Sequence, residues 1–285
     1  MSNWYIDRDS LKAALTIPAT TTGDHALLGT IIEGVSRQFD HYLGFAVYPS
    51  SGVRYYTAKD ANCLYVDAPL TAVDSIQTDV DGDTTYETTM QASNFYLAPL
   101  NASMETPPRP YWEIKSARNA STVFPPHADR GVKVTGTWGY TNKLNGAVSP
   151  TLATAAASGT TTLEINGATT LHAGQTILIG GERMFITSVP RNASDAATTS
   201  GITVERAVNG TSAVAHTCAT TISVYEYPVF SQAALYQAQQ DYRVKDAPLG
   251  VAGADAFGTQ RPITAGGLHP WTKRMLEQFR KPVIA

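Results

Sequence analysis

The sequence predicts an α+β protein, in which helices near both ends of the chain flank antiparallel β-structure. Two observations support the helices: an apolar stripe with helical spacing covers residues 24–43, and a second helical period begins after Pro228. A third observation supports the strands, because short apolar stretches between these regions are separated by turn residues. Helices and strands that are segregated along a chain are typical of the α+β class.

The composition excludes several classes of protein. With 285 residues, 43% of them hydrophobic, the chain can bury a sizeable core. Its net charge of −3 argues against disorder and against nucleic-acid binding by the whole protein. No apolar run has the length of a membrane span, and the first residues lack the pattern of a secretory signal. We therefore expect the protein to be made in the cytoplasm and not to associate with a membrane.

Charge divides the chain into three regions. Residues 1–147 carry a balance of −4, residues 148–227 a balance of −2, and residues 228–285 a balance of +3. The middle region also holds 16 threonines. Such changes in composition predict boundaries, with an α+β core in 1–147, an inserted all-β module in 148–227, and a helix, a Gly-rich arm and a final helix in 228–285.

The first region begins with helices. In the 24–43 stripe, Asp24 is the expected N-cap and Gly44 the expected terminator. A short helix through Leu15, with Asp9 or Ser10 as the expected N-cap, precedes it and cannot extend far because of Pro18. Strands are then expected for a small antiparallel sheet at 64–66, 68–70, 94–97, 111–114 and 132–138.

The second and third regions differ in kind. Five short strands are expected in the middle region, at 163–165, 175–179, 183–189, 202–205 and 222–225. That number in about 80 residues predicts a compact barrel or sandwich. A helix follows Pro228, the Gly- and Ala-rich segment 247–267 is expected to be an extended arm, and a last helix begins near Pro270.

No motif predicts catalysis, a cofactor or a metal. The nucleophile-elbow and phosphate-loop patterns are absent, the six histidines lack metal-ligand spacing, and the two cysteines are 155 positions apart. Asp79, Asp81 and Asp83 surround a glycine, but the spacing of a calcium loop is missing, and a hairpin turn with an acidic tip is the favoured interpretation.

The C-terminal end carries the one candidate binding surface. From Thr259 onward there are five basic residues and one acidic residue, with aromatic side chains among them. Two interpretations stay open: an amphipathic helix packed on its own domain, or a helix that docks on a partner, since aromatic residues and Arg are enriched at interfaces. The candidate partner-binding residues are Trp271, Arg274, Met275, Phe279, Arg280 and Lys281.

Several stretches, in order, resemble the head–tail connector (adaptor) family of tailed bacteriophages. These are LLGTIIEGVSRQFDHYLG at 27–44, LYVDAPLTAVDSI at 64–76, RGVKVTGTWGY at 130–140 and the helix with its Gly-rich tail at 230–258. The resemblance covers residues 1–147 and 228–258. The segment 148–227 departs from it, because family members run nearly directly from the Gly-Tyr strand into the next helix, and it resembles β-modules of phage virion proteins.

The resemblance implies a structural role and no enzyme. Adaptors form a ring of about twelve subunits by repeated heterologous contacts. The ring lies in the neck of the virion, between the portal protein and the tail or stopper protein, and DNA passes through its channel without sequence-specific binding. The C-terminal arm would bind the portal or a neighbouring subunit, and deletion of 259–285 is expected to leave a folded chain that no longer joins portals.

Two other classes stay open. One is a tail or capsid decoration protein, for which the 148–227 module is the relevant unit. The other is a glycan-degrading phage enzyme, in which paired carboxylates such as Asp79 and Glu87 would act. Copy number separates a decoration protein from an adaptor.

Overall fold

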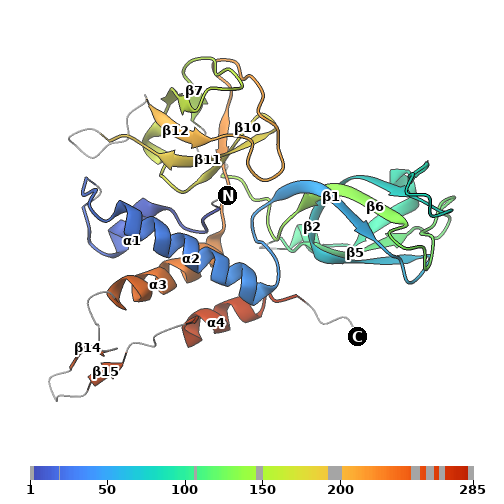
Figure 1. Ribbon diagram of the computed structural model, residues 1–285, viewed down its shortest axis with the longest axis horizontal. Helices are drawn as coiled ribbons and strands as arrows, with labels where there is room; N and C mark the ends of the chain where they lie inside the picture. The colour runs from blue at the N-terminus through green and yellow to red at the C-terminus, as the bar shows by residue number, and fades with distance from the viewer. Residues whose placement is uncertain are drawn as a thin grey trace. The chain divides into compact units, whose positions relative to one another are not determined.

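The computed structural model of the protein is shown in Figure 1. It describes residues 3–18, 20–105, 108–145, 150–191, 201–244, 251–254, 260–262 and 267–281. Helices and antiparallel sheets are both present, which confirms the α+β class.

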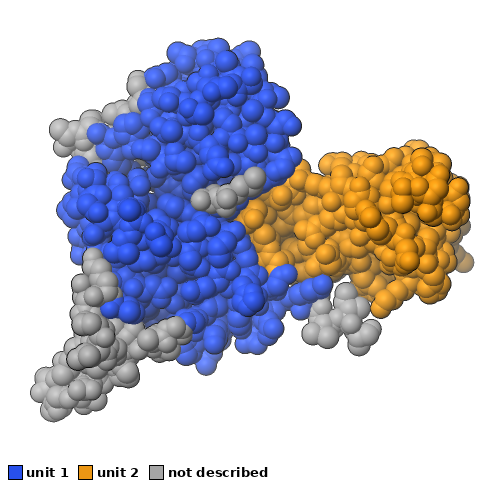
Figure 2. Space-filling model, in the orientation of Figure 1, with its two compact units in different colours: residues 1–44, 143–285 blue, residues 45–142 orange. Residues whose placement is uncertain are grey.

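The chain divides into two compact units, coloured separately in Figure 2. Unit 1 combines 1–44 with 143–285, and unit 2 is 45–142. The ranges expected from the sequence followed composition, whereas these units follow contacts. They differ because helices from the two ends of the chain pack on one another, which composition along the chain does not reveal.

Four helices belong to unit 1: α1 (Arg8–Ala14), α2 (His25–Leu43), α3 (Pro228–Val244) and α4 (Pro270–Glu277). α2 buries one face, which contains Leu28, Ile32 and Phe39, and it packs against α3. Gly44 ends α2 in the left-handed conformation, with φ of +81°, as expected of a glycine terminator. Asp24 precedes the helix, but its carboxylate accepts a hydrogen bond from the Tyr242 hydroxyl instead of capping it.

The rest of unit 1 is mostly a β-module, the name used here for the described residues between 150 and 227. Its strands are β7 (Thr151–Leu152), β8 (Thr162–Leu163), β9 (Ile165–Asn166), β10 (Thr176–Ile179), β11 (Glu182–Ser188), β12 (Ile202–Glu205) and β13 (Ile222–Val224). Five of them form an antiparallel sheet in the order β13-β10-β11-β12-β8, and β7 pairs with β9. A 3₁₀ turn, η3 (Ala168–Thr170), precedes β10. Apolar side chains of these elements form one buried cluster.

The N-terminal segment joins the β-module to the helices within unit 1 (Figure 1). Asn3 exchanges two side-chain hydrogen bonds, of 2.7 and 2.8 Å, with Asn209 of the β-module. Trp4 packs edge-on against Phe185 of β11, with ring centroids 5.5 Å apart, and its indole N–H donates to Glu33 of α2. Through these contacts the N-terminal segment holds the sheet of the β-module against the helices.

Unit 2 is built from β1 (Ser50–Tyr56), β2 (Cys63–Thr78), β3 (Thr88–Thr89), β4 (Phe95–Ala98), β5 (Tyr111–Ser116) and β6 (Val132–Trp138). They form one antiparallel sheet in the order β1-β6-β2-β5-β4, with β3 on β2. Two 3₁₀ turns, η1 (Ala92–Asn94) and η2 (Ala102–Met104), flank β4. The stretches 64–66 and 68–70, which run together in the sequence, belong to the one strand β2, because it pairs with β5 up to Leu70 and with β6 from there on.

The expected arm falls mostly outside the described residues. Within it, β14 (Val251–Ala254) and β15 (Gln260–Pro262) form a two-stranded antiparallel pair. Among the described helices, none has both the length and the apolar composition needed to cross a membrane.

Candidate interaction surface

Local sequence explains where α4 begins. Pro270 occupies the first turn, where a missing N–H costs nothing, and His269 is the N-cap. The ring Nδ1 of His269 accepts a hydrogen bond of 3.2 Å from the Trp271 backbone N–H. The start of the helix is therefore defined by its own residues.

One face of α4 anchors it to unit 1. The side chains of Thr272 and Leu276 are fully buried, and Phe279 just after the helix is 9% exposed. The Phe279 ring lies 5.0 Å from the ring of Phe230 in α3. Burial of a leucine and a phenylalanine contributes about 1.5–3 kcal/mol each, so this face holds α4 against α3.

The opposite face presents aromatic and basic side chains to solvent. Trp271 is 39% exposed although its ring rests on Tyr236, with centroids 4.6 Å apart. Lys273 and Arg274 are exposed, and neither has an acidic side chain within 4.0 Å among the described residues. Exposed aromatic side chains and arginines are enriched among residues that contact partners.

The six predicted binding residues separate into two groups in this structure. Trp271, Arg274, Arg280 and Lys281 lie on the exposed face, and the Arg280 guanidinium lies 5.3 Å from the Tyr42 ring centroid. Met275 is half-buried. Phe279 belongs instead to the core of its own unit, because the helical spacing that placed it beside Met275 also points it at α3.

A second exposed charged feature is the turn between β2 and β3 in unit 2. Asp79 is 2% exposed, and its carboxylate accepts hydrogen bonds from the Gly82 and Thr84 N–H groups, at 2.7 and 2.8 Å. The hairpin turn with an acidic tip is therefore confirmed. Both oxygens of Asp79 hold the turn by accepting these backbone hydrogen bonds. Glu87, the carboxylate that the enzyme hypothesis pairs with Asp79, lies within 4.8 Å of it.

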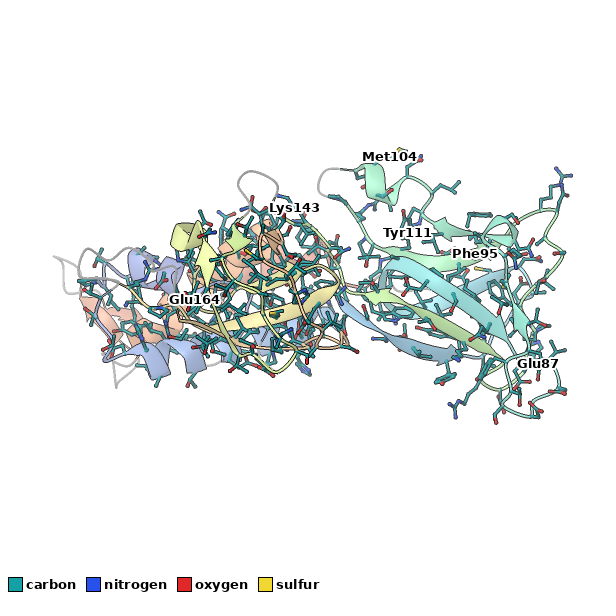
Figure 3. The ribbon with its side chains drawn as sticks, turned by 90° about the horizontal axis from the view of Figure 1, so that it is seen from above. Glu87, Phe95, Met104, Tyr111, Lys143 and Glu164 are labelled. Carbon is teal, nitrogen blue, oxygen red and sulfur yellow. The ribbon has the colours of Figure 1, made fainter. Side chains whose placement is uncertain are left out.

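The tip of this turn is acidic and solvent-exposed. Asp81, Asp83 and Glu87 are exposed, and Val80 between them is 71% exposed. Figure 3 shows Glu87 at the margin of unit 2, far from Met104. Carboxylate oxygens of Asp79, Asp81 and Glu87 lie within 4.8 Å of one another. In the part of the chain that the structure describes, no basic side chain pairs with the three exposed carboxylates.

The β-module contains an ion pair in which the Glu182 side chain is fully buried and the Arg206 side chain is 6% exposed. Glu182 accepts two hydrogen bonds from the Arg206 guanidinium, at 2.8 and 2.7 Å, one from His216, and others from the Ala207 and Val214 N–H groups. Burial opposes ionisation of Glu182, but these bonds outweigh it and lower its pKa to about 2. This network holds the loop after β12 in place.

A smaller ion cluster joins α1 to the β-module. The Asp9 carboxylate lies 3.0 Å from His172 Nδ1 and 2.5 Å from Arg191 Nη2. Burial opposes ionisation of Asp9, yet the hydrogen bonds from His172 and Arg191 lower its pKa to about 2. The bond to Asp9 raises the pKa of His172. Asp7, Asp9 and His172 could offer metal ligands, but the Arg191 cation already occupies the Asp9 carboxylate.

A groove of about 520 Å³ lies in unit 1, between the N-terminal segment, the β-module and the start of α3. Its volume falls in the range of small-molecule sites. Its described lining includes Trp4, Tyr225 and the carboxylates of Asp7 and Glu226, and no lysine or arginine. The groove therefore disfavours anionic ligands.

Comparison with known proteins gives no family. No protein-family model matches the chain, and no curated protein matches it.

Proposed function

We propose that this chain is a structural head-to-tail adaptor of a tailed bacteriophage. In this proposal about twelve copies form a ring between the portal protein and the tail or stopper protein and extend the DNA channel. The chain acts by shape and repeated contacts and has no catalytic role. The 24–43 helix and the sheet of unit 2 build the ring, and the 148–227 module is an inserted barrel or sandwich.

The observation that carries the proposal is the division of α4 into two faces. Leu276 and Thr272 fix the helix on α3, so its other face is held rigid. That face keeps a tryptophan and two cations, Lys273 and Arg274, in solvent. A rigid helix that exposes an aromatic side chain among cations is suited to a protein partner, because little conformational entropy is lost on binding.

The experiment that tests the proposal is the copy number of the chain in purified phage particles. Quantitative mass spectrometry against the portal protein should give a ratio near unity, as one ring per particle requires. A large excess over portal contradicts the proposal and favours a decoration protein. Absence from particles also contradicts it and would favour the glycan-degrading enzyme.

Removal of 259–285 is not a clean test of portal binding. The deletion takes away Leu276 and Phe279, which are buried against unit 1, and exposes the apolar surface of α3 beneath them. Loss of incorporation would then reflect damage to the fold. Substitutions confined to exposed residues avoid this, because Lys273 and Arg274 are exposed and form no ion pair with any residue that the structure describes.

A further inference from the structure

We propose that the exposed face of α4 binds the acidic turn 79–87 of a second copy of this chain. This inference rests on the proposed ring, and it names the partner of α4 within it. One surface of each copy meets a different surface of the next, which is the heterologous contact that closed rings require.

The α4 side of the contact is basic and has one exposed aromatic side chain. Trp271 is 39% exposed, Arg274 follows it by one helical turn, and Lys273 is exposed on another side of the helix. Arg280 and Lys281 add positive charge beyond the helix end, and Glu277 is the one exposed acid among them. Because Tyr236 supports the Trp271 ring from below, the indole is fixed in position before any partner arrives.

The turn has the complementary arrangement. Val80 is 71% exposed, and Asp81, Asp83 and Glu87 of the same turn are exposed too. Asp79 holds the turn through two backbone hydrogen bonds, so the tip is also formed before binding. Its carboxylates repel one another at close range, which a cationic partner would relieve.

The two surfaces fit each other in charge and in polarity. Two cations without acidic partners face three carboxylates without basic partners, counted among the described residues. Each surface also exposes one large apolar side chain, Trp271 or Val80, and apolar contacts together with charged ones are usual in interfaces. Complementary charge also disfavours wrong pairings, such as α4 against α4.

The test uses two charge-reversed full-length chains. The first carries Lys273→Glu and Arg274→Glu, and the second carries Asp81→Lys and Glu87→Lys. In each chain alone, like charges meet at the contact, so the dissociation constant for self-association should rise at least about tenfold. In an equimolar mixture, the acidic α4 of the first chain can meet the basic turn of the second, and the unaltered α4 of the second can meet the unaltered turn of the first. The oligomer should therefore form again. Light scattering after gel filtration at low salt measures both.

Matched controls keep the number of reversed charges the same. Lys59→Glu with Arg118→Glu, and Asp74→Lys with Asp129→Lys, change exposed residues of unit 2 outside the turn. Both controls should assemble like the wild type.

Three results would overturn the contact: single variants that assemble normally, a mixture that stays dissociated, or a wild-type chain that does not self-associate. The first two leave the adaptor proposal intact, because the particle copy number decides that separately. A mixture that stays dissociated is also the result expected if α4 binds the turn of its own chain, because mixing two variants cannot restore a contact within one chain.

Discussion

The buried charged side chains of the β-module and the exposed ones of α4 differ in whether they have partners of opposite charge. Glu182 is surrounded by a guanidinium, an imidazole and backbone N–H groups, and none of its side chain is exposed. Lys273 and Arg274 are exposed and have no acidic partner among the described residues. In a chain with only 16% charged residues, the first kind holds the fold and the second kind is available to a partner.

The largest effect is expected at the buried pair. Glu182→Ala leaves the Arg206 cation in the interior without its anion, so the free energy of unfolding should fall by about 3–5 kcal/mol. Urea denaturation measures this. Glu205→Ala, at an exposed position of β12, is the control and should change stability by less than about 0.5 kcal/mol. Equal effects of the two substitutions would contradict the role of the network.

The anchored face of α4 should be the next most sensitive region. Leu276→Ala removes a fully buried side chain and should lower the free energy of unfolding by about 2–4 kcal/mol. Glu277→Ala, the exposed neighbour, should have little effect. If both substitutions were neutral in thermal and urea unfolding, α4 would not be packed on α3 in solution.

The Asp9 cluster should make stability depend on pH in two directions. The pKa of Asp9 falls from 3.8 to about 2 on folding, so its contribution is present above pH 3.8 and is lost as the pH falls toward 2. The pKa of His172 is raised from 6.5, so its contribution is present below pH 6.5 and is lost as the pH rises through the higher, folded value.

The substitutions that test this cluster are Asp9→Asn and His172→Gln. Asp9→Asn should cost on the order of 2 kcal/mol near pH 5 and much less near pH 2. His172→Gln should remove the loss of stability on the alkaline side. Urea unfolding across the pH range measures both, and parallel curves for wild type and variants would rule out the coupling.

The smallest effect is expected on the exposed face of α4. Lys273→Glu with Arg274→Glu should change the free energy of unfolding by less than about 0.5 kcal/mol, because both side chains are exposed and neither forms an ion pair with a described residue. The double variant and the wild type should then have the same thermal midpoint. Marked destabilisation would mean that these cations support the fold, and the two kinds of charge would no longer be distinct.

The sequence predicted the helices that are marked by nearby residues, such as an apolar stripe or a proline in the first turn. The 24–43 stripe gave α2 within one residue of each end, and Pro270 marked the start of α4. The start of α1 was misjudged, because Asp7 caps it through the Ser10 N–H, while Asp9 turns toward Arg191. Asp7, Asp9 and Ser10 are all suitable N-caps by residue type. Which of them caps the helix depends on the contact between Asp9 and the distant β-module.

The candidate site was predicted in part for the same reason. Helical spacing places Trp271, Met275 and Phe279 near one another, but it does not say which side of the helix faces α3. The acidic tip was predicted from the sequence as a turn, whereas the exposure of Val80, and the lack of an ion pair between Glu87 and any described residue, depend on the folded surface. The Glu182 network had no sequence signal, because Arg206 and His216 reach it only through the loop after β12.

The most direct measurement is the ratio of chain to portal protein in phage particles assembled with the Lys273→Glu, Arg274→Glu chain. If exposed charges bind partners and buried charges hold the fold, this ratio should fall from near unity to near zero while the thermal midpoint of the chain is unchanged. A ratio that stays at the wild-type value would contradict the claim that this face of α4 binds a partner.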